Sequence, residues 1–256
     1  MSSMATIAVF NQKGGVGKTT TTLNIASALA MLERNPLAID LDPQAHLTHS
    51  LGVNQETSNG ISSFFRDERS LLDLIQYRSS GLRLIPAHSD LSKIDALFGK
   101  SGNVASRLRE GLGEQLARDN SPIVIDCCPM LGILSLNAII SADRVLIPVS
   151  ADFLSMHGVQ KVVSLLDVLQ ARYGRKFDFR ILLTRFNARR KLSFSIYDKL
   201  RDRFGDRVCN TRIMENVSLA ESPAYGKDVF SYAPNSQGAK DYFALTHELI
   251  EAGFFY

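Results

Sequence analysis

Residues 10–24, FNQKGGVGKTTTTLN, decide the fold class. They follow a short apolar run at 6–10 and open a segment of helical period that begins at Lys18 and reaches about Glu33. The glycines between run and helix let backbone N–H groups converge on an anion, which the helix N-terminus also attracts. The stretch predicts a strand, a phosphate-binding loop and a helix in that order.

Short apolar runs rich in Val and Ile alternate with longer segments of helical period along the whole chain. This alternation predicts an α/β fold, a doubly wound and mostly parallel sheet with helices on both faces, in a single domain over 1–256. The predicted strands are 6–10, 37–40, 82–85, 123–126, 145–149, 179–184 and 208–211. Helical faces recur within 159–169, 194–204 and 239–250, whereas 55–60 and 101–113 read as surface loops or helix junctions.

The composition restricts the class of protein further. A length of 256 residues suits one large α/β domain with its own core. The N-terminal apolar run is too short for a signal peptide or a membrane span, which predicts a cytoplasmic protein. Cys127, Cys128 and Cys209 have neither a metal-ligand spacing nor a disulfide framework, which favours buried reduced thiols over an iron–sulfur or zinc site.

Basic residues are concentrated in one segment. Residues 172–215 hold 13 Lys or Arg against 5 Asp or Glu, whereas the remainder of the chain holds 16 against 21. The formal net charge of +3 therefore combines a basic segment with an acidic body. This asymmetry favours a polyanionic partner, and a solvated helical face with ion pairs is the alternative explanation.

Two lysines flank the glycines of the loop. In a phosphate-binding loop Lys18, after the last glycine, reaches the β- and γ-phosphates, and the Thr19 hydroxyl binds magnesium. The strict pattern G-x-x-x-x-G-K-[ST] fails, because Gln12 stands where its first glycine belongs. The motif is instead K-G-G-x-G-K-T-T, and it begins with a second lysine, Lys13.

Three aspartates stand where predicted strands end. Asp40 and Asp42 close the second run and Asp126 closes the run at 123–126, at the edge where parallel sheets bind their ligands. Carboxylates at this edge suit magnesium binding and the positioning of a water molecule. Turn chemistry is the alternative explanation for Asp42, because it precedes Pro43.

The loop variant resembles the deviant Walker A motif of the ParA/MinD family of partition and positioning ATPases. The resemblance continues through AIDLDPQ (38–44), IVIDCCP (123–129), VLIPVSADFLSMHG (145–158), ILLTRFNAR (181–189) and the segment 216–242, and it is strongest with the ParA branch. It implies a P-loop NTPase fold that binds ATP and Mg²⁺ and hydrolyses ATP slowly. It also implies a sandwich homodimer in which Lys13 touches the phosphates bound by the other subunit.

The resemblance assigns roles to individual residues. The expected catalytic residues are Lys13, Lys18 and Asp42, and the expected magnesium site is Thr19, Asp40 and Asp126. The expected ATP contacts are Lys13, Gly14, Gly15, Val16, Gly17, Lys18, Thr19 and Thr20, with Phe186, Asn187 and Met214 near the base. The expected DNA contacts are Arg185, Arg189, Arg190, Lys191 and Arg212.

The resemblance also implies partners. ATP-bound dimers would bind nonspecific double-stranded DNA at the nucleoid, and a ParB-like adaptor would stimulate hydrolysis and connect the dimer to a plasmid, chromosome or protein cargo. Three cations usual in the family are absent, at Glu215, Ser218 and Gln237. MinD-like relatives bind membranes through a basic tail, but this chain ends HELIEAGFFY, so membrane binding is not expected. A P-loop small-molecule ligase or kinase and a regulatory module with negligible ATP turnover are the alternative functions.

Overall fold

One seven-stranded sheet organises the residues that the computed structural model describes, which are 5–53, 60–98, 102–116, 119–152 and 155–256. The strand order is β3-β4-β2-β5-β1-β6-β7, with every neighbouring pair parallel except β3 with β4. The strands are β1 (Thr6–Val9), β2 (Leu37–Leu41), β3 (Gln76–Tyr77), β4 (Arg83–Ile85), β5 (Ile123–Cys127), β6 (Arg144–Ser150) and β7 (Asp178–Thr184). The mostly parallel sheet and six predicted strands are confirmed, whereas β3 was not predicted.

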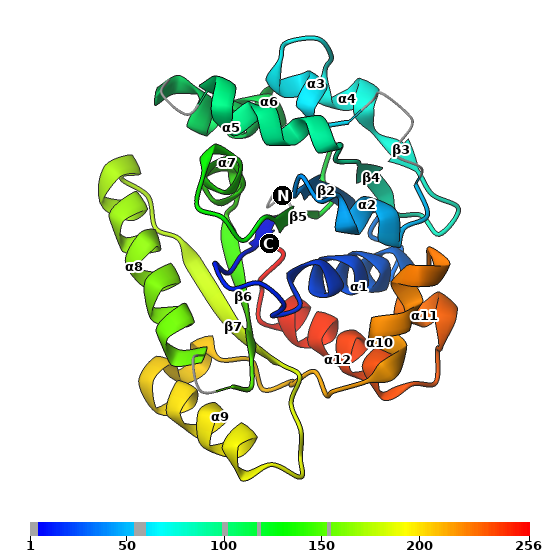
Figure 1. Ribbon diagram of the computed structural model, residues 1–256, viewed down its shortest axis with the longest axis vertical. Helices are drawn as coiled ribbons and strands as arrows, with labels where there is room; N and C mark the ends of the chain where they lie inside the picture. The colour runs from blue at the N-terminus through cyan, green and yellow to red at the C-terminus, as the bar shows by residue number, and fades with distance from the viewer. Residues whose placement is uncertain (1–4, 54–59, 99–101, 117–118, 153–154) are drawn as a thin grey trace.

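Helices cover both faces of the sheet, as Figure 1 shows. Ile7 and Val9 of β1 join a core with α1 and α12, whereas Ala8 of β1 and Phe10, which follows the strand, join the larger core with α7, α8 and α9. The α-helices are α1 (Lys18–Met31), α2 (His46–Ser50), α3 (Ser62–Phe65), α4 (Leu71–Leu74), α5 (Ser92–Phe98), α6 (Arg107–Gln115), α7 (Ile133–Ser141), α8 (Ser155–Tyr173), α9 (Lys191–Phe204), α10 (Val217–Glu221), α11 (Val229–Tyr232) and α12 (Gln237–Glu251). Burial on both faces explains why the strands read as continuous apolar runs.

The prediction of a strand at 208–211 is wrong. The segment pairs with the sheet only through an isolated parallel bridge to Ile181. The backbone N–H groups of Asn210 and Thr211 donate instead to the two carboxylate oxygens of Glu248 on α12, at 2.6 and 2.7 Å. The Glu248 carboxylate thus accepts the hydrogen bonds that a neighbouring strand would accept in a sheet. The apolar pattern of 208–211 carries no signal of this distant acceptor.

The prediction of a loop or helix junction at 101–113 is corrected in its described part. A 3₁₀ turn (Gly102–Ser106) leads into α6, so the segment ends inside a helix. Gly111 is a packing residue there, because a Cβ at this position would lie 2.5 Å from Cζ of Phe64. Residues 55–59 of the other predicted loop lie outside the described residues.

The aromatic C-terminal segment is part of the core. Phe254 and Phe255 are 1% and 0% exposed, and the Phe255 carbonyl accepts a hydrogen bond from Ala5 N at 3.0 Å. The apolar tail is therefore packed on the body rather than presented to a membrane surface. No helix within the described residues combines the length and the apolar character needed to cross a bilayer.

Candidate nucleotide site

The loop between β1 and α1 has the backbone of an anion cradle. Gly15 (φ 72°) and Gly17 (φ 86°) adopt the left-handed conformation that disfavours residues with a Cβ. The buried Asn11 fixes the start of the loop, since its Nδ2 donates to Pro148 O at 2.8 Å and its Oδ1 accepts from Lys13 N at 3.0 Å. The loop is therefore shaped by the protein itself.

The two lysines of the loop point to different places. Lys18 is 7% exposed and its Nζ donates to the carbonyl of Lys13 at 3.0 Å, across its own loop. Burial lowers the pKa of Lys18, and the nearby Asp126 carboxylate acts in the opposite direction. The Lys13 Nζ instead pairs with Oδ2 of Asp152 after β6 at 2.5 Å, where the two side chains are 36% and 43% exposed. The Lys18 side chain thus lies inside the phosphate loop, whereas the Lys13 side chain lies at the surface beside Asp152.

Thr19 and Asp126 meet where the helix begins. Thr19 Oγ1 donates to Oδ2 of Asp126 at 2.8 Å, and the more distant Thr22 Oγ1 donates to Oδ1 at 3.3 Å. Burial raises the pKa of Asp126 well above its ordinary value, and the neighbouring Asp40 carboxylate adds to the rise. The Thr19 hydroxyl and the buried Asp126 carboxylate, with the buried Asp40 carboxylate beside them, leave a deficit of positive charge that fits a magnesium ion.

Asp40 and Asp42 occupy the end of β2, beside the end of β5. Asp40 pairs in register with Asp126, and its Oδ1 accepts from Asp42 N at 3.1 Å while its Oδ2 accepts from Thr48. Burial raises the pKa of Asp40 to about 6, despite the hydrogen bonds from Thr48. Oδ1 of Asp42 accepts from Gln44 N at 2.9 Å, and within the described residues no donor contacts its Oδ2. Both oxygens of Asp40 thus accept hydrogen bonds from the protein, whereas one oxygen of Asp42 remains available to another donor.

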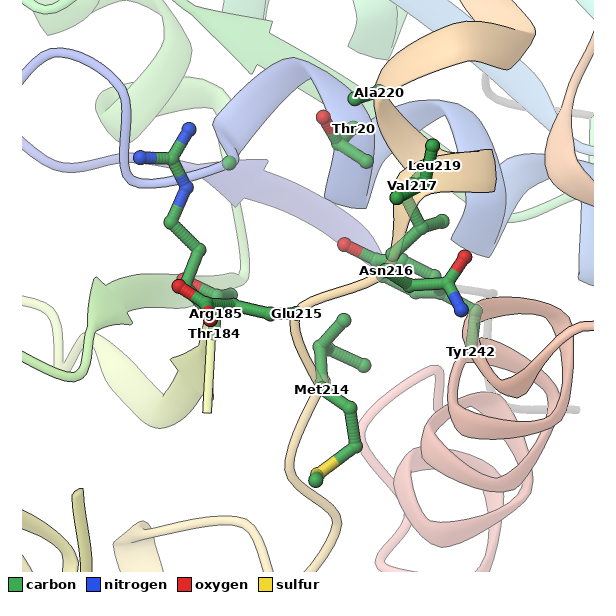
Figure 2. Close-up of a pocket in the computed structure, with 12 residues that line it drawn as sticks. Thr20, Thr184, Arg185, Met214, Glu215, Asn216, Val217, Leu219, Ala220 and Tyr242 are labelled. Atoms are coloured by element: carbon green, nitrogen blue, oxygen red, sulfur yellow. The ribbon is translucent and has the colours of Figure 1, made fainter. Parts of the chain in front are cut away.

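A pocket of about 410 Å³ adjoins the phosphate loop at the ends of β7 and α12, and Figure 2 shows its lining. Met214, expected near the base, lines this pocket together with Gly17 and Thr20 of the loop. Phe186 is in the core and Asn187 does not line the pocket; Asn187 Nδ2 donates to Glu215 at 3.0 Å. The lining residues that the sequence did not single out for the nucleotide site are Thr184, Ile213, Glu215, Asn216, Val217, Leu219, Ala220 and Tyr242.

The five predicted DNA contacts do not form one cluster. Arg189, Arg190 and Lys191 are exposed together at the start of α9. Arg185 lines the same pocket as Gly17, and in Figure 2 its side chain extends alongside the phosphate loop. Arg212 is half-buried, with its guanidinium 4.7 Å from the ring centroid of Phe186 and 4.9 Å from that of Tyr197.

The three cysteines are buried, as predicted, and none of them forms a disulfide. Burial raises the pKa of Cys127 well above its ordinary value and that of Cys209 to about 12, so both remain protonated thiols at neutral pH. No group of three or more His, Cys, Asp or Glu side chains in the described part of the chain is arranged to hold a metal ion. The Thr19 and Asp126 site differs from such a cluster, because in P-loop proteins the nucleotide phosphates supply further oxygen ligands to the magnesium ion.

A glycine cradle at a helix N-terminus, a buried lysine and a threonine–aspartate pair together define a P-loop nucleotide-binding protein. A family model described as an AAA domain matches residues 4–179. The chain is 35% identical over 250 residues to the chromosome partitioning protein ParA of Myxococcus xanthus, covering 96% of this chain and 87% of the relative. It is 32% identical to the sporulation initiation inhibitor protein Soj of Bacillus subtilis, covering 96% and 98%.

Solved structures agree with this assignment. A cobyrinic acid a,c-diamide synthase from Mycobacterium smegmatis, described with bound ADP and magnesium, superposes with a TM-score of 0.84 at 26% identity and covers 98% of this chain and 95% of its own. The chain belongs to the ParA/MinD family of P-loop ATPases.

Proposed function

We propose that this protein is a ParA-type partition or positioning ATPase that binds ATP and Mg²⁺, closes into a sandwich homodimer, binds nonspecific duplex DNA and releases it after slow hydrolysis. In this proposal a ParB-like adaptor stimulates hydrolysis and links the dimer to a plasmid, chromosome or protein cargo. The protein would be cytoplasmic and, in its ATP state, associated with the nucleoid.

The different surroundings of the two lysines are the observation that carries the proposal. Lys18 is buried inside its own loop, so it suits the phosphates of its own nucleotide. Lys13 is held at the surface by Asp152, outside that cradle. A cation in that place suits phosphates presented by a second subunit, and binding energy available only in the dimer makes ATP shift the population toward it.

Hydrolysis needs a positioned water molecule and compensation of phosphate charge. Magnesium, when bound, would supply part of that compensation, and Thr19 with Asp126 would hold it while Asp40 supports the site. The free oxygen of Asp42 is suited to orient or deprotonate the attacking water. Lys18 and the backbone N–H groups of the loop would bind the phosphate oxygens, and the pocket that contains Met214 would take the base.

The exposed start of α9 supports the proposed DNA contact. Arg189, Arg190 and Lys191 present three cations on adjoining positions. Among the residues that the structure describes, Arg190 is the only one of the three that approaches a carboxylate, Glu215 at 3.8 Å. A surface of this kind binds phosphates without reading sequence and is therefore sensitive to salt. Glu215 stands at a position where the family has an arginine, so we expect weaker DNA binding than in relatives that keep it.

Co-sedimentation with duplex DNA of arbitrary sequence tests the proposal, with ATP or ADP and at two salt concentrations. We expect binding in ATP at low salt, loss of binding in ADP, and a steep decrease when salt is raised. Binding that is equal in both nucleotides, or no binding at low salt, would count against the DNA-carrier function. Light scattering on the same samples reports whether ATP produces the dimer.

A small-molecule amide ligase is the second candidate, because one similar solved structure bears the name of a diamide synthase. Such an enzyme would release phosphate only when a carboxylic acid and an ammonia donor are both present. Phosphate release that is independent of added acids but increases with DNA and an adaptor would exclude this candidate.

A further inference from the structure

A buried threonine outside the phosphate loop connects two strands at the Asp42 turn. Thr48 lies on α2 and is 1% exposed. Its backbone N–H and its Oγ1 both donate to Oδ2 of Asp40, at 2.9 and 2.7 Å, and Oγ1 accepts from Ala87 N at 3.0 Å. Ala87 follows β4, the neighbour of β2 in the sheet. The hydroxyl of Thr48 thus acts as donor and acceptor at once.

The same chain of hydrogen bonds continues to the catalytic carboxylate. Asp40 accepts from Thr48 through Oδ2 and from Asp42 N through Oδ1, the latter at 3.1 Å. Asp42 then accepts from Gln44 N at 2.9 Å, which fixes one of its own oxygens. The orientation of the remaining Asp42 oxygen therefore depends on an anchor that begins at Thr48.

The turn that carries Asp42 has an unfavourable backbone conformation. Ala45, directly before α2, has φ 52° and ψ 34° and is fully buried. A residue with a Cβ in the left-handed region persists only where its surroundings hold it. The two hydrogen bonds from Thr48 to Asp40 join the residues that follow and precede this turn. They therefore oppose a change of the Ala45 backbone toward a more favourable conformation.

We propose that Thr48 is a positioning residue for ATP hydrolysis, acting through Asp40 on Asp42. This inference rests on the proposed ATPase function. Thr48 is not among the residues that line the pocket beside the phosphate loop, and its hydroxyl binds Asp40 and Ala87. We therefore expect its effect to act through the geometry of the Asp42 carboxylate. Small displacements of a water-positioning group cause large losses in rate, whereas nucleotide affinity is set by Lys18 and the pocket.

The test compares Thr48→Val, which keeps the shape and removes the hydroxyl, with Thr48→Ser, which restores it. Basal ATP hydrolysis gives kcat, and titration with a fluorescent ATP analogue gives the nucleotide Kd. We expect kcat to fall about ten-fold in Thr48→Val with Kd changed less than about two-fold, and Thr48→Ser to recover most of the rate. Ser141→Ala is the matched control, because it removes a buried hydroxyl that donates to Asn137 O on α7.

A double-mutant cycle separates positioning from general destabilisation. In an Asp42→Ala background, Thr48→Val should change the small residual rate less than about two-fold, while its effect on unfolding by urea persists. An equal loss of rate in both backgrounds, or a wild-type kcat in Thr48→Val, would overturn the inference. If Thr48→Val does not fold, Thr48→Cys replaces it in the test. We then expect a smaller loss of kcat, and a wild-type kcat in Thr48→Cys would also overturn the inference. A wild-type protein without ATPase activity would instead remove the proposed function itself.

Discussion

At the scale of single residues, we predict that the two loop lysines have separable roles. Replacing Lys18 removes the buried cation of the phosphate cradle, so we predict that Lys18→Ala abolishes ATP binding. Lys13→Ala leaves that cradle intact and should bind ATP but fail to hydrolyse it, because dimer catalysis is lost. Titration with a fluorescent ATP analogue and phosphate release measure the two effects. Normal turnover in Lys13→Ala would contradict the role of the second lysine.

Asp40 should make stability depend on pH. Burial raises its pKa from 3.8 to about 6, so the folded state holds its proton more tightly than the unfolded state does. The stabilisation is complete below pH 3.8 and is lost as pH rises through about 6. We predict that the unfolding free energy of the wild type, minus that of Asp40→Asn, falls by ~3 kcal/mol across this window without divalent cations.

Urea unfolding at several pH values in the presence of a chelator measures this difference. Asp167→Asn, at an exposed aspartate of α8, is the control for removing a carboxyl at the surface. A difference for Asp40→Asn that is no steeper than the difference for Asp167→Asn would contradict the prediction.

At the scale of elements, the hydrophobic pattern of the sequence predicted the strands that are buried on both faces. It did not predict where a single long-range contact replaces a strand. The strands at 123–127 and 144–150 follow from apolar runs because both faces of the sheet are covered. The segment 208–211 kept the same pattern, but Glu248 binds its backbone N–H groups. A contact between residues so far apart in sequence leaves no local signal.

The candidate site likewise contains residues that local motifs predicted and residues that only the fold brings together. The loop from Lys13 to Thr20 and the strand-end aspartates are local motifs, and the structure brings them together because β1, β2 and β5 adjoin. The pocket beside the phosphate loop combines Gly17 and Thr20 with the end of β7, the segment 213–220 and Tyr242 of α12. Apart from Met214, which the family resemblance suggested, the residues outside the loop share no spacing or composition, so only the fold shows that they lie together.

The contact between the phosphate loop and the end of β6 predicts an effect on dimerisation. Asp152 holds the Lys13 Nζ, and this ion pair must break before Lys13 can reach another subunit. The pair is half-exposed and therefore contributes at most about 1 kcal/mol. We predict that Asp152→Asn lowers the protein concentration for ATP-dependent dimerisation by about two- to five-fold, as measured by analytical ultracentrifugation.

Asp178→Asn is the control for that variant, because it removes a similarly exposed ion pair with Arg144 away from the loop. It should leave the dimerisation midpoint unchanged. An unchanged or raised midpoint in Asp152→Asn would mean that the ion pair does not compete with the dimer contact.

At the scale of the whole molecule, the basic segment of the sequence is distributed over a long edge of the fold. Arg172 lies at the end of α8, before β7, whereas Arg189, Arg190 and Lys191 follow the other end of β7. If ATP closes the proposed dimer at the phosphate loop, we expect the second group and not the first to respond, because the first lies a strand length away. The number of Lys and Arg residues in 172–215 is therefore larger than the number that one DNA-binding surface could present.

This division of the charge gives a prediction about DNA affinity. Arg189→Ala should weaken binding of the ATP state to duplex DNA and reduce the slope of log K against log salt by about one per lost phosphate contact. Arg172→Ala removes an equally exposed arginine on α8 and should leave affinity and slope unchanged. Fluorescence anisotropy with a labelled duplex at several salt concentrations, alongside ATP titration, measures both. Equal losses in the two variants would contradict this prediction, because they would mean that net charge, and not the start of α9, governs DNA binding.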